Sequence, residues 1–217
     1  MNTNMEKILI VTSVDAEKEA IERGLVDVSK FDVHVIGVGP MNAAAATAVQ
    51  LTKQKYDLVI NMGIGGGFPE VAEVGSIVVS TEQVAADLGA ESPNGFKPIE
   101  ELGFGESRMI NDSQLVATIV TKLKKADLST YQGPILTLAT VTGTRETTQV
   151  LAERIPGAAV EAMEGFGVAT AAKQQGIPTV EIRAISNPVG PRDRGAWKIK
   201  EALQALEKAS VALKEVF

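Results

Sequence analysis

Short runs of apolar, mostly β-branched residues alternate along this chain with helix-like segments, and this alternation limits the fold more than any other feature. The predicted strands are 7–12, 33–38, 58–62, 75–81, 135–142 and 179–185. The predicted helices are 16–23, 42–53, 113–125, 146–155, 161–175 and 197–216. Near-continuous apolar strands that alternate with helices are typical of a mainly parallel sheet covered on both faces. The sequence therefore predicts an α/β fold.

Length and composition narrow the class of protein. A chain of 217 residues is most simply one domain, here 1–217, and is long enough to bury a substantial core. A net charge of -6 without any basic run argues against a nucleic-acid partner. The absence of Cys and the single His argue against disulfides, thiolate catalysis and a metal site, so we expect no metal and no cofactor.

Nothing in the sequence predicts a membrane location. No segment approaches the roughly 20 apolar residues of a membrane span, and the polar start is unlike a signal peptide. A chain without Cys also suits a reducing compartment. We therefore expect a cytoplasmic protein with no membrane partner.

One long stretch, 87–110, is rich in Gly, Pro and Ser and has no clear periodicity. Such a stretch inside an α/β chain indicates a surface excursion, either a lid or a contact with a partner, rather than a domain boundary.

Polar and glycine-rich segments follow five of the predicted strands, at 13–17, 37–40, 63–67, 141–145 and 186–194. Ligands of open α/β sheets gather at the carboxyl ends of the strands, so these are candidate site loops. The glycines of 63–67 allow close approach of a ligand to the backbone. A dinucleotide fingerprint would follow the first strand and open a helix at once, and a phosphate-binding loop would end in Gly-Lys-Ser/Thr; neither pattern is present. A tight turn without a ligand remains the alternative.

Several single residues have both a chemical and a structural reading. Glu17 lies in the first turns of a predicted helix, where negative charge is stabilising in any case. Glu164 either improves the start of the predicted helix 161–175 or binds a ribose diol, with the thioether of Met163 on the sugar face. Trp197 is by default a core anchor at the start of the last helix, and Arg192 and Arg194 a solvated cluster.

Read together and in order, these segments resemble the purine nucleoside phosphorylase and nucleosidase superfamily. The resemblance runs from Lys7 to about Trp197 and rests on the acid-rich helix start, the glycine-rich strand, the Met-Glu pair and the run Arg-Ala-Ile-Ser before a polar residue. It is nearest to the methylthioadenosine/S-adenosylhomocysteine nucleosidases and, within that group, to the futalosine hydrolases. It implies three αβα layers around a central, mainly parallel mixed sheet, and assembly as a homo-oligomer, a dimer or larger.

The resemblance also implies roles for individual residues. Glu17 matches the acid that activates the attacking water, Glu164 the carboxylate that holds the ribose hydroxyls, and Met163 the sulfur beneath the sugar. The backbone near ribose and base corresponds to Gly63, Ile64 and Gly65. Trp197 falls where an aromatic residue often covers the 5′ end of the ligand.

Asn187 departs from the adenine-cleaving members, which have Asp at this point. An Asn amide donates to N7 or to a 6-oxo group but is no general acid at neutral pH, so Asn187 favours a hypoxanthine or guanine base. Segments 13–17 and 63–80 contain no Arg for a phosphate, which favours hydrolysis over phosphorolysis. We therefore expect a purine nucleosidase that cleaves futalosine, in menaquinone biosynthesis, with Glu17 and Asn187 as catalytic residues.

The 5′ tail of futalosine bears an aromatic carboxylate. We expect Trp197 to stack on its ring and Arg145, Arg192 or Arg194 to meet its carboxylate, surface arginines being the alternative. Three other functions compete. These are a methylthioadenosine nucleosidase, a non-catalytic purine nucleoside sensor, which would not need Glu17, and, distantly, a dinucleotide oxidoreductase.

Overall fold

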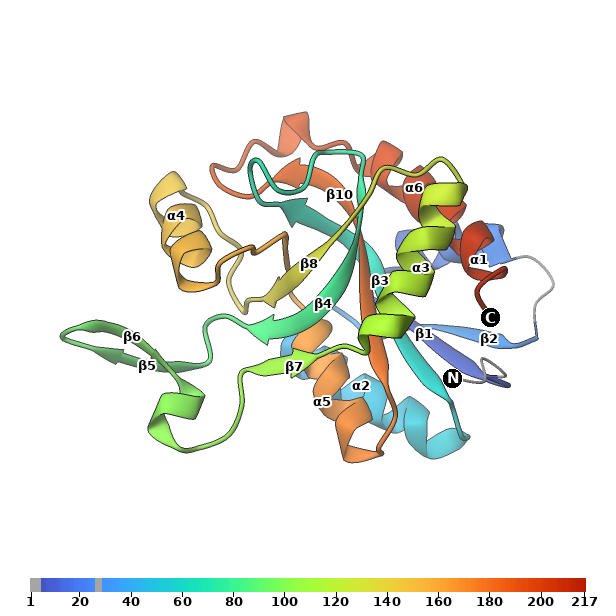
Figure 1. Ribbon diagram of the computed structural model, residues 1–217, viewed down its shortest axis with the longest axis horizontal. Helices are drawn as coiled ribbons and strands as arrows, with labels where there is room; N and C mark the ends of the chain where they lie inside the picture. Colours follow the sequence, from blue (N-terminus) through green and yellow to red (C-terminus); the bar gives the residue numbers. More distant parts are fainter. Residues whose placement is uncertain (1–4, 26–28) are drawn as a thin grey trace.

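The computed structural model describes residues 5–25 and 29–217, and within them eight strands form one sheet (Figure 1). The strands of this sheet are β1 (Ile8–Thr12), β2 (Phe31–Val35), β3 (Leu58–Gly67), β4 (Ile77–Ala85), β7 (Arg108–Ile110), β8 (Thr130–Thr137), β9 (Val160–Ala162) and β10 (Thr179–Pro188). Their order is β10-β4-β8-β9-β3-β1-β2, with β7 beside β4. Five of the pairings are parallel and three antiparallel, so the sheet is mixed and mainly parallel.

The sheet curls round on itself, because β10 pairs with β3 on one side and with β4 on the other. A closed ring of strands results, made of β3, β10, β4, β8 and β9. Outside this ring, β1 pairs with β3, and β2 is the edge strand beside β1. The ring brings the carboxyl end of β10 beside the glycines of β3, and it is this closure that lets residues far apart in sequence share one site.

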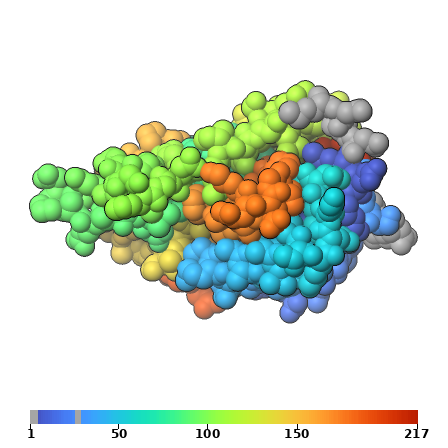
Figure 2. Space-filling view, turned by 90° about the horizontal axis from the view of Figure 1, so that it is seen from below, coloured from blue at the N-terminus to red at the C-terminus, as the bar shows by residue number. Residues whose placement is uncertain are grey.

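Helices cover both faces of the sheet. The helices are α1 (Asp15–Leu25), α2 (Pro40–Lys53), α3 (Ser113–Lys125), α4 (Arg145–Arg154), α5 (Gly165–Gln174) and α6 (Ile199–Leu213). On one face α1, α3 and α6 pack on the largest apolar cluster, and on the other α2 and α5 lie side by side (Figure 2). The predicted three-layer αβα fold is confirmed.

Local sequence accounts for most of these elements. All five residues of β1 are buried, as a strand covered on both faces requires. Asp112 accepts hydrogen bonds from the N–H groups of Gln114 and Leu115 and so caps α3, and Thr144 caps α4 in the same way. Helix α6 buries Ala202, Ala205, Leu206, Ala209, Ser210, Ala212 and Leu213, a face with helical spacing.

Two predicted elements are wrong in a way that matters for the site. The glycine-rich segment does not follow a strand as a loop but continues β3 to Gly67. Glycine is needed there because the sheet closes tightly: a Cβ on Gly65 would lie 2.6 Å from Cγ1 of Val160. The predicted helix 161–175 is shorter and starts later, because Val160–Ala162 is β9 and α5 begins at Gly165.

Other boundaries moved as well. The strand predicted over 135–142 is β8, which ends at Thr137, so 138–144 is a loop before α4. Trp197 does not open the last helix; it closes a short 3-10 turn, η2 (Arg194–Ala196), and α6 starts at Ile199. Because the chain turns at η2, Trp197 lies half-buried beside the end of β10. It is not the core anchor that its place in the sequence suggests.

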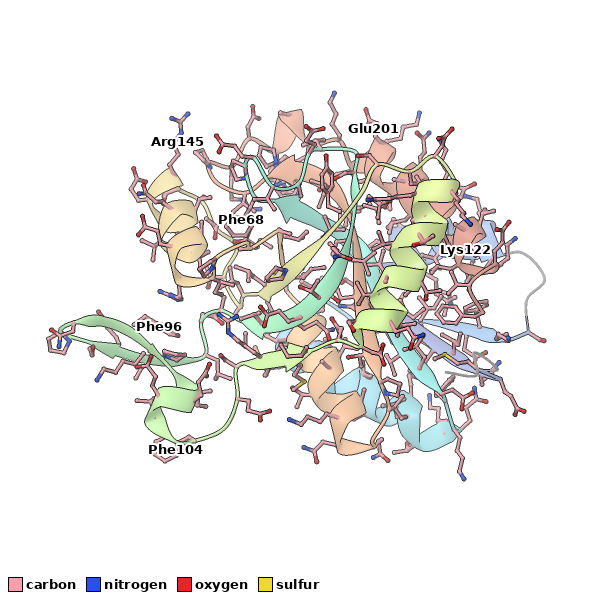
Figure 3. The ribbon with its side chains drawn as sticks, in the orientation of Figure 1. Phe68, Phe96, Phe104, Lys122, Arg145 and Glu201 are labelled. Atoms are coloured by element: carbon pink, nitrogen blue, oxygen red, sulfur yellow. The ribbon has the colours of Figure 1, made fainter. Side chains whose placement is uncertain are left out.

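The stretch 87–110 is the surface excursion that the sequence predicts, although it holds more structure than expected. It contains a hairpin of β5 (Gly89–Ser92) and β6 (Gly95–Pro98), the turn η1 (Ile99–Leu102) and then β7. The hairpin projects from one end of the molecule, and Phe96 packs under the guanidinium of Arg154, 3.9 Å from the ring centroid (Figures 1 and 3). None of the helices in the described ranges is long and apolar enough to cross a membrane.

Candidate active site

Glu17 is the first element of the site and is fixed from four sides. It lies in the first turn of α1 and is 3 % exposed. Its Oε2 accepts hydrogen bonds from Oγ1 of Thr12 at 2.6 Å and from the N–H groups of Ser13 at 3.0 Å and Val14 at 3.3 Å. Its Oε1 accepts from the N–H of Ile64 at 2.8 Å. The carboxylate therefore sits between the end of β1 and β3 in one defined orientation.

Gly63 makes room for this arrangement. A Cβ at this position would lie 2.8 Å from Oε1 of Glu17 and 2.5 Å from Nη1 of Arg183. The glycine thus lets a carboxylate and a guanidinium meet over β3. Packing therefore explains why position 63 is a glycine. Gly63 is one of the three residues that the sequence places near the ligand, with Ile64 and Gly65.

Glu164 is the second carboxylate and is also held from several sides. It precedes α5, is 3 % exposed, and its Oε1 accepts from the N–H of Gly39 at 3.2 Å. Its Oε2 accepts from the N–H of Met163 at 3.3 Å and from Nη2 of Arg183 at 3.0 Å. Gly39 has a φ of 93°, a backbone conformation that favours glycine. The predicted loop 37–40 and the Met-Glu pair are therefore parts of one site.

Arg183 donates directly to Glu164 and is linked to Glu17 through the backbone of Ile64, although no motif in the sequence assigned it to the site. It is 1 % exposed, with Nη1 donating to the carbonyl oxygen of Ile64 at 3.2 Å and Nε to Oε1 of Glu181 at 2.8 Å. Charged residues two apart in an otherwise apolar strand lie on the same face of a sheet. The sequence Glu181-Ile182-Arg183 carried that signal, because a buried charge requires a buried partner.

The electrostatics of the site follow from this geometry. Burial alone would lower the pKa of Arg183, but the charges of Glu181, Glu164 and Glu17 raise it above its usual value. Burial raises the pKa of Glu181, while Arg183 opposes that rise. The guanidinium therefore stays charged and is surrounded by acidic side chains.

Asn187 lies on the neighbouring edge of the site, where β10 has an irregular register against β3. It is partly exposed, its Oδ1 accepts from Oγ of Ser186 at 2.8 Å, and its Nδ2 donates to the carbonyl of Pro188 at 2.9 Å. A Cβ on Gly66 would lie 3.3 Å from Nδ2. The amide is thus presented beside the glycine strand and has few constraints.

Trp197 is tied to the same edge through its neighbour, because the N–H of Lys198 donates to the carbonyl of Ser186 at 2.8 Å. The guanidinium carbons of Arg192 and Arg194 lie 5.6 Å and 5.9 Å from the centre of its ring. Two arginines and an aromatic ring therefore lie together next to Asn187. We call Trp197, Arg192 and Arg194 the rim cluster.

Arg145 stands apart from these groups. It is exposed at the first turn of α4 and its side chain points outward (Figure 3). It lines a cavity of about 550 Å³ with Phe68, Thr148, Pro188 and Val189, and so approaches the loop that follows Asn187 from outside. Its position does not bring it to Glu17 or Glu164 by any contact that the structure gives.

Glu161 links the buried part of the site to the loop before α4. Its Oε1 accepts from the N–H of Thr142 at 2.9 Å, and its Oε2 accepts from the hydroxyl of the same residue. Burial raises the pKa of Glu161, and the hydrogen bonds from Thr142 oppose that rise. The loop 138–144 is thereby fastened beside Gly66, which pairs with Glu161. No group of His, Asp and Glu side chains in residues 5–25 and 29–217 has the arrangement of a metal site.

Known proteins resemble this chain in both sequence and structure. The phosphorylase superfamily matches residues 14–217. A futalosine hydrolase of Streptomyces coelicolor is 45% identical, with 93% of this chain and 92% of that protein covered. A futalosine hydrolase of Acidothermus cellulolyticus is 44% identical, with coverages of 95% and 90%. The crystal structure of a 5′-methylthioadenosine/S-adenosylhomocysteine nucleosidase of Neisseria meningitidis with methylthio-immucillin-A has a TM-score of 0.82 at 20% identity, covering 97% of this chain and 99% of that one.

Proposed function

Since this chain belongs to the phosphorylase superfamily and, within it, to the futalosine hydrolases, we propose that its site hydrolyses the N-ribosyl bond of futalosine. The products are hypoxanthine and dehypoxanthine futalosine, and the reaction belongs to menaquinone biosynthesis. The observation that carries the proposal is that Arg183 holds Glu164 and also the carbonyl of Ile64, whose N–H holds Glu17, with Asn187 on the adjoining edge. A non-catalytic sensor is disfavoured because the relatives that this chain matches at 44–45% identity are named as hydrolases.

Glu17 is the general base of the proposed reaction. Four donors fix its carboxylate, and the free lone pair of Oε1 can accept a proton from a water molecule placed against C1′. As the water oxygen bonds to C1′, its proton passes to Glu17, and the C1′–N9 bond breaks with its electron pair leaving on the purine. A positioned base of this kind contributes about 10²–10⁴-fold to the rate.

Glu164 and Met163 hold the sugar. Because Arg183 and two backbone N–H groups fix Glu164, the one remaining lone pair, on Oε1, points in a set direction and can accept a hydrogen bond from a ribose hydroxyl. Met163 is half-buried beside it, where its thioether can pack on the apolar sugar face. The sugar develops positive charge as the bond breaks, and the carboxylates stabilise that charge.

Asn187 receives the base. Its Oδ1 accepts a hydrogen bond from Ser186 and its Nδ2 donates one hydrogen to the carbonyl of Pro188, so the second N–H of Nδ2 is the donor proposed to face the ligand. A donor at this place stabilises negative charge on N7 or on a 6-oxo group of departing hypoxanthine. Adenine would present its own amino group to this donor, which leaves both donors unpaired and favours the 6-oxopurine.

Water rather than phosphate is the proposed nucleophile. Among residues 5–25 and 29–217, the cation found at the centre is Arg183, which has Glu17, Glu164 and Glu181 around it. Three carboxylates facing one guanidinium leave the centre acidic, and an acidic centre repels a phosphate dianion. This supports hydrolysis more strongly than the missing arginines in the sequence do.

The rim cluster is the proposed contact of the 5′ tail. Trp197 offers a face for the aromatic ring of futalosine, and Arg192 and Arg194 flank that face with donors suited to a carboxylate. Arg145 is a weaker candidate for the carboxylate contact, since it lies at the start of α4 and lines a separate cavity beside Pro188 and Val189.

We also propose that the protein is cytoplasmic and that it assembles as a homo-oligomer. Apolar side chains that are largely exposed in the single chain support an assembly; they include Met41, Phe104 and Ile110. Light scattering at several protein concentrations would test it, and a mass equal to one chain throughout would reject it.

Product analysis tests the function. The protein is incubated with futalosine, inosine and methylthioadenosine, each with and without phosphate, and the released base is identified by chromatography. We expect hypoxanthine from futalosine at a rate that phosphate does not change. Preferred release of adenine from methylthioadenosine would reject futalosine as the substrate, and a requirement for phosphate would reject hydrolysis.

A further inference from the structure

Glu181 is a fully buried carboxyl group that the proposed reaction does not use directly. It lies two residues before Arg183 in β10, so both side chains leave the same face of the strand. Its Oε1 accepts from Nε of Arg183 at 2.8 Å and from Nδ2 of Asn61 at 3.2 Å. Glu181 therefore touches the centre of the site only through Arg183.

The second oxygen of Glu181 is placed at a cost. Oε2 lies against the start of α5, so close that a Cβ on Gly165 would overlap it. Within the described residues neither this oxygen nor Oδ1 of Asn61 has a donor in good hydrogen-bond geometry, although the side chain of Gln83 lies near enough to Glu181 to oppose the rise of its pKa. Buried acceptors without donors destabilise a fold, whereas a buried guanidinium requires a buried carboxylate as partner. Glu164 already provides such a partner for Arg183, so charge balance alone does not call for a second carboxyl group at Glu181.

The reason lies in the geometry of Arg183. A guanidinium is a rigid planar fork, so fixing Nε also fixes the directions of both Nη groups. Nη2 then points at Oε2 of Glu164, and Nη1 at the carbonyl oxygen of Ile64. Glu164 has no other side-chain donor in the described part of the chain, and Ile64 is the residue whose N–H holds Glu17.

We propose that Glu181 is a positioning residue: by holding Nε of Arg183 it sets the plane of the guanidinium, and through it the orientation of Glu164 toward the ribose. This inference rests on the proposed function, because it assigns to Glu164 a ribose hydroxyl of the substrate. A tilt of the guanidinium would displace Glu164, and misplacement of a binding group by about 1 Å can cost about 10²-fold in rate.

A double-mutant cycle tests whether Glu181 acts through Arg183. The wild type, Glu181→Leu, Arg183→Met and the double variant are assayed for kcat and KM with futalosine. We expect Glu181→Leu to lower kcat about 30- to 100-fold in the wild type, and less than about threefold once Arg183 is already Met. Losses that multiply in the double variant would overturn the proposal, because Glu181 would then act independently of Arg183.

Two further variants separate positioning from packing. Glu181→Gln keeps an acceptor for Nε, so its kcat should lie within about fivefold of the wild type. Asn61→Leu removes the other partner of Glu181 and leaves the bond to Arg183, so it should reduce thermal stability and keep kcat within about threefold. A fall in kcat for Asn61→Leu as large as that for Glu181→Leu would overturn the proposal. If a Leu or Met variant does not fold, the cycle is run with Glu181→Asp, whose shorter side chain withdraws the acceptor from Nε, and Arg183→Lys; equal losses for Glu181→Asp in both backgrounds would overturn the proposal.

Calorimetric titration with inosine, with Glu17→Gln added to every protein so that hydrolysis is slow, repeats the cycle as a binding measurement, since ribose binding by Glu164 is the quantity at issue. Glu181→Leu should weaken inosine binding about tenfold when Arg183 is present and little in the Arg183→Met background. If the wild type released no base from futalosine, the proposed function would fail, and the inosine cycle would still decide the role of Glu181. Equal weakening in both backgrounds would reject that role whatever the substrate.

Discussion

The buried centre and the rim of this site are built differently. Glu17, Glu164 and Arg183 are each almost fully buried and each fixed by several hydrogen bonds from different strands and helices. Asn187 and Trp197 lie half-buried at the end of β10 and in the turn after it, each with few polar contacts. The centre is held by several strands and helices at once, whereas Asn187 is placed by the pairing of β10 with β3 alone and Trp197 by the turn that follows.

This difference teaches where chemistry and selectivity are located. A group that must keep one orientation during bond cleavage is held by elements that cannot move separately. A group that chooses among substrates needs only the right donor or acceptor at the right edge. We therefore expect changes at the centre to lower the rate for every substrate, and changes at the rim to alter the ratio between substrates.

The largest expected effect is at Glu17. Glu17→Gln removes the base and should lower kcat for futalosine and for inosine by about 10²–10⁴-fold, with KM nearly unchanged. Steady-state kinetics measure the loss, and Asp15→Asn, an exposed acid in the same helical turn, is the matched control with unchanged rates. A Glu17→Gln protein that retained more than a tenth of the wild-type kcat would remove Glu17 from the mechanism.

Gly165→Ala should have the next largest effect. The new Cβ would overlap Oε2 of Glu181 and push the carboxyl group away from Arg183, so both thermal stability and kcat should fall, the rate by about 10²-fold. Adding Glu181→Asp, which shortens the side chain, should recover part of the stability but not the rate. Recovery of both would mean that Glu181 only fills space.

Asn187→Asp should change selectivity more than rate. Asp accepts from a 6-amino group and can protonate N7, so the ratio of kcat/KM for futalosine to that for methylthioadenosine should fall about 10²-fold or more. Thermal stability should stay close to that of the wild type, because Asn187 donates only to a neighbouring carbonyl. An unchanged ratio would show that the base is read elsewhere.

Single changes in the rim cluster should have modest effects. Arg192→Ala and Arg194→Ala should each raise KM for futalosine about two- to fivefold, because an exposed ion pair contributes about 1 kcal/mol or less. KM for inosine, which lacks the tail, is the internal control and should not change. Arg145→Ala should alter neither substrate by more than about twofold if Arg145 stays outside the site. Equal losses on both substrates would remove the carboxylate contact from the account.

The smallest expected effect is at Glu161, which joins centre and rim. Burial raises its folded pKa, so the folded state holds the proton more tightly than the unfolded chain, in which the pKa of Glu is about 4.3. Stability contributed by this group is therefore present at acid pH and is lost as pH rises through the raised pKa. Urea denaturation should show that the free energy of unfolding of Glu161→Gln rises relative to that of the wild type between pH 5 and pH 8. A relative loss over that interval would contradict the assignment.

The same division explains how much the sequence could predict. Glu17, Met163, Glu164 and Asn187 stand in short motifs at the ends of strands, and such motifs can be read in one dimension. Arg183 was missed as a site residue because its role arises from the pairing of β10 with β3, which is set by closure of the sheet. The sequence predicts helix where the structure has β9, because β9 is only three residues long. Three residues are too few to show the alternation of buried and exposed side chains that identifies a strand.

The glycines show the same limit. Gly63 and Gly65 predict close approach, and the sequence favoured a loop that exposes N–H groups to a ligand. In the structure the approach is to Arg183, Glu17 and Val160 within a continuing strand. Glycine within a strand indicates that another group approaches the backbone closely. Only the folded structure shows whether that group belongs to a ligand or to the protein itself.

The most direct measurement of the central claim is the origin of the new oxygen on the sugar. Futalosine is turned over in oxygen-18 water with excess unlabelled phosphate, and the products are weighed by mass spectrometry. The account predicts free hypoxanthine and a dehypoxanthine futalosine that carries a single oxygen-18 atom, with no sugar phosphate. A phosphorylated sugar, or a product whose new oxygen did not come from water, would contradict it.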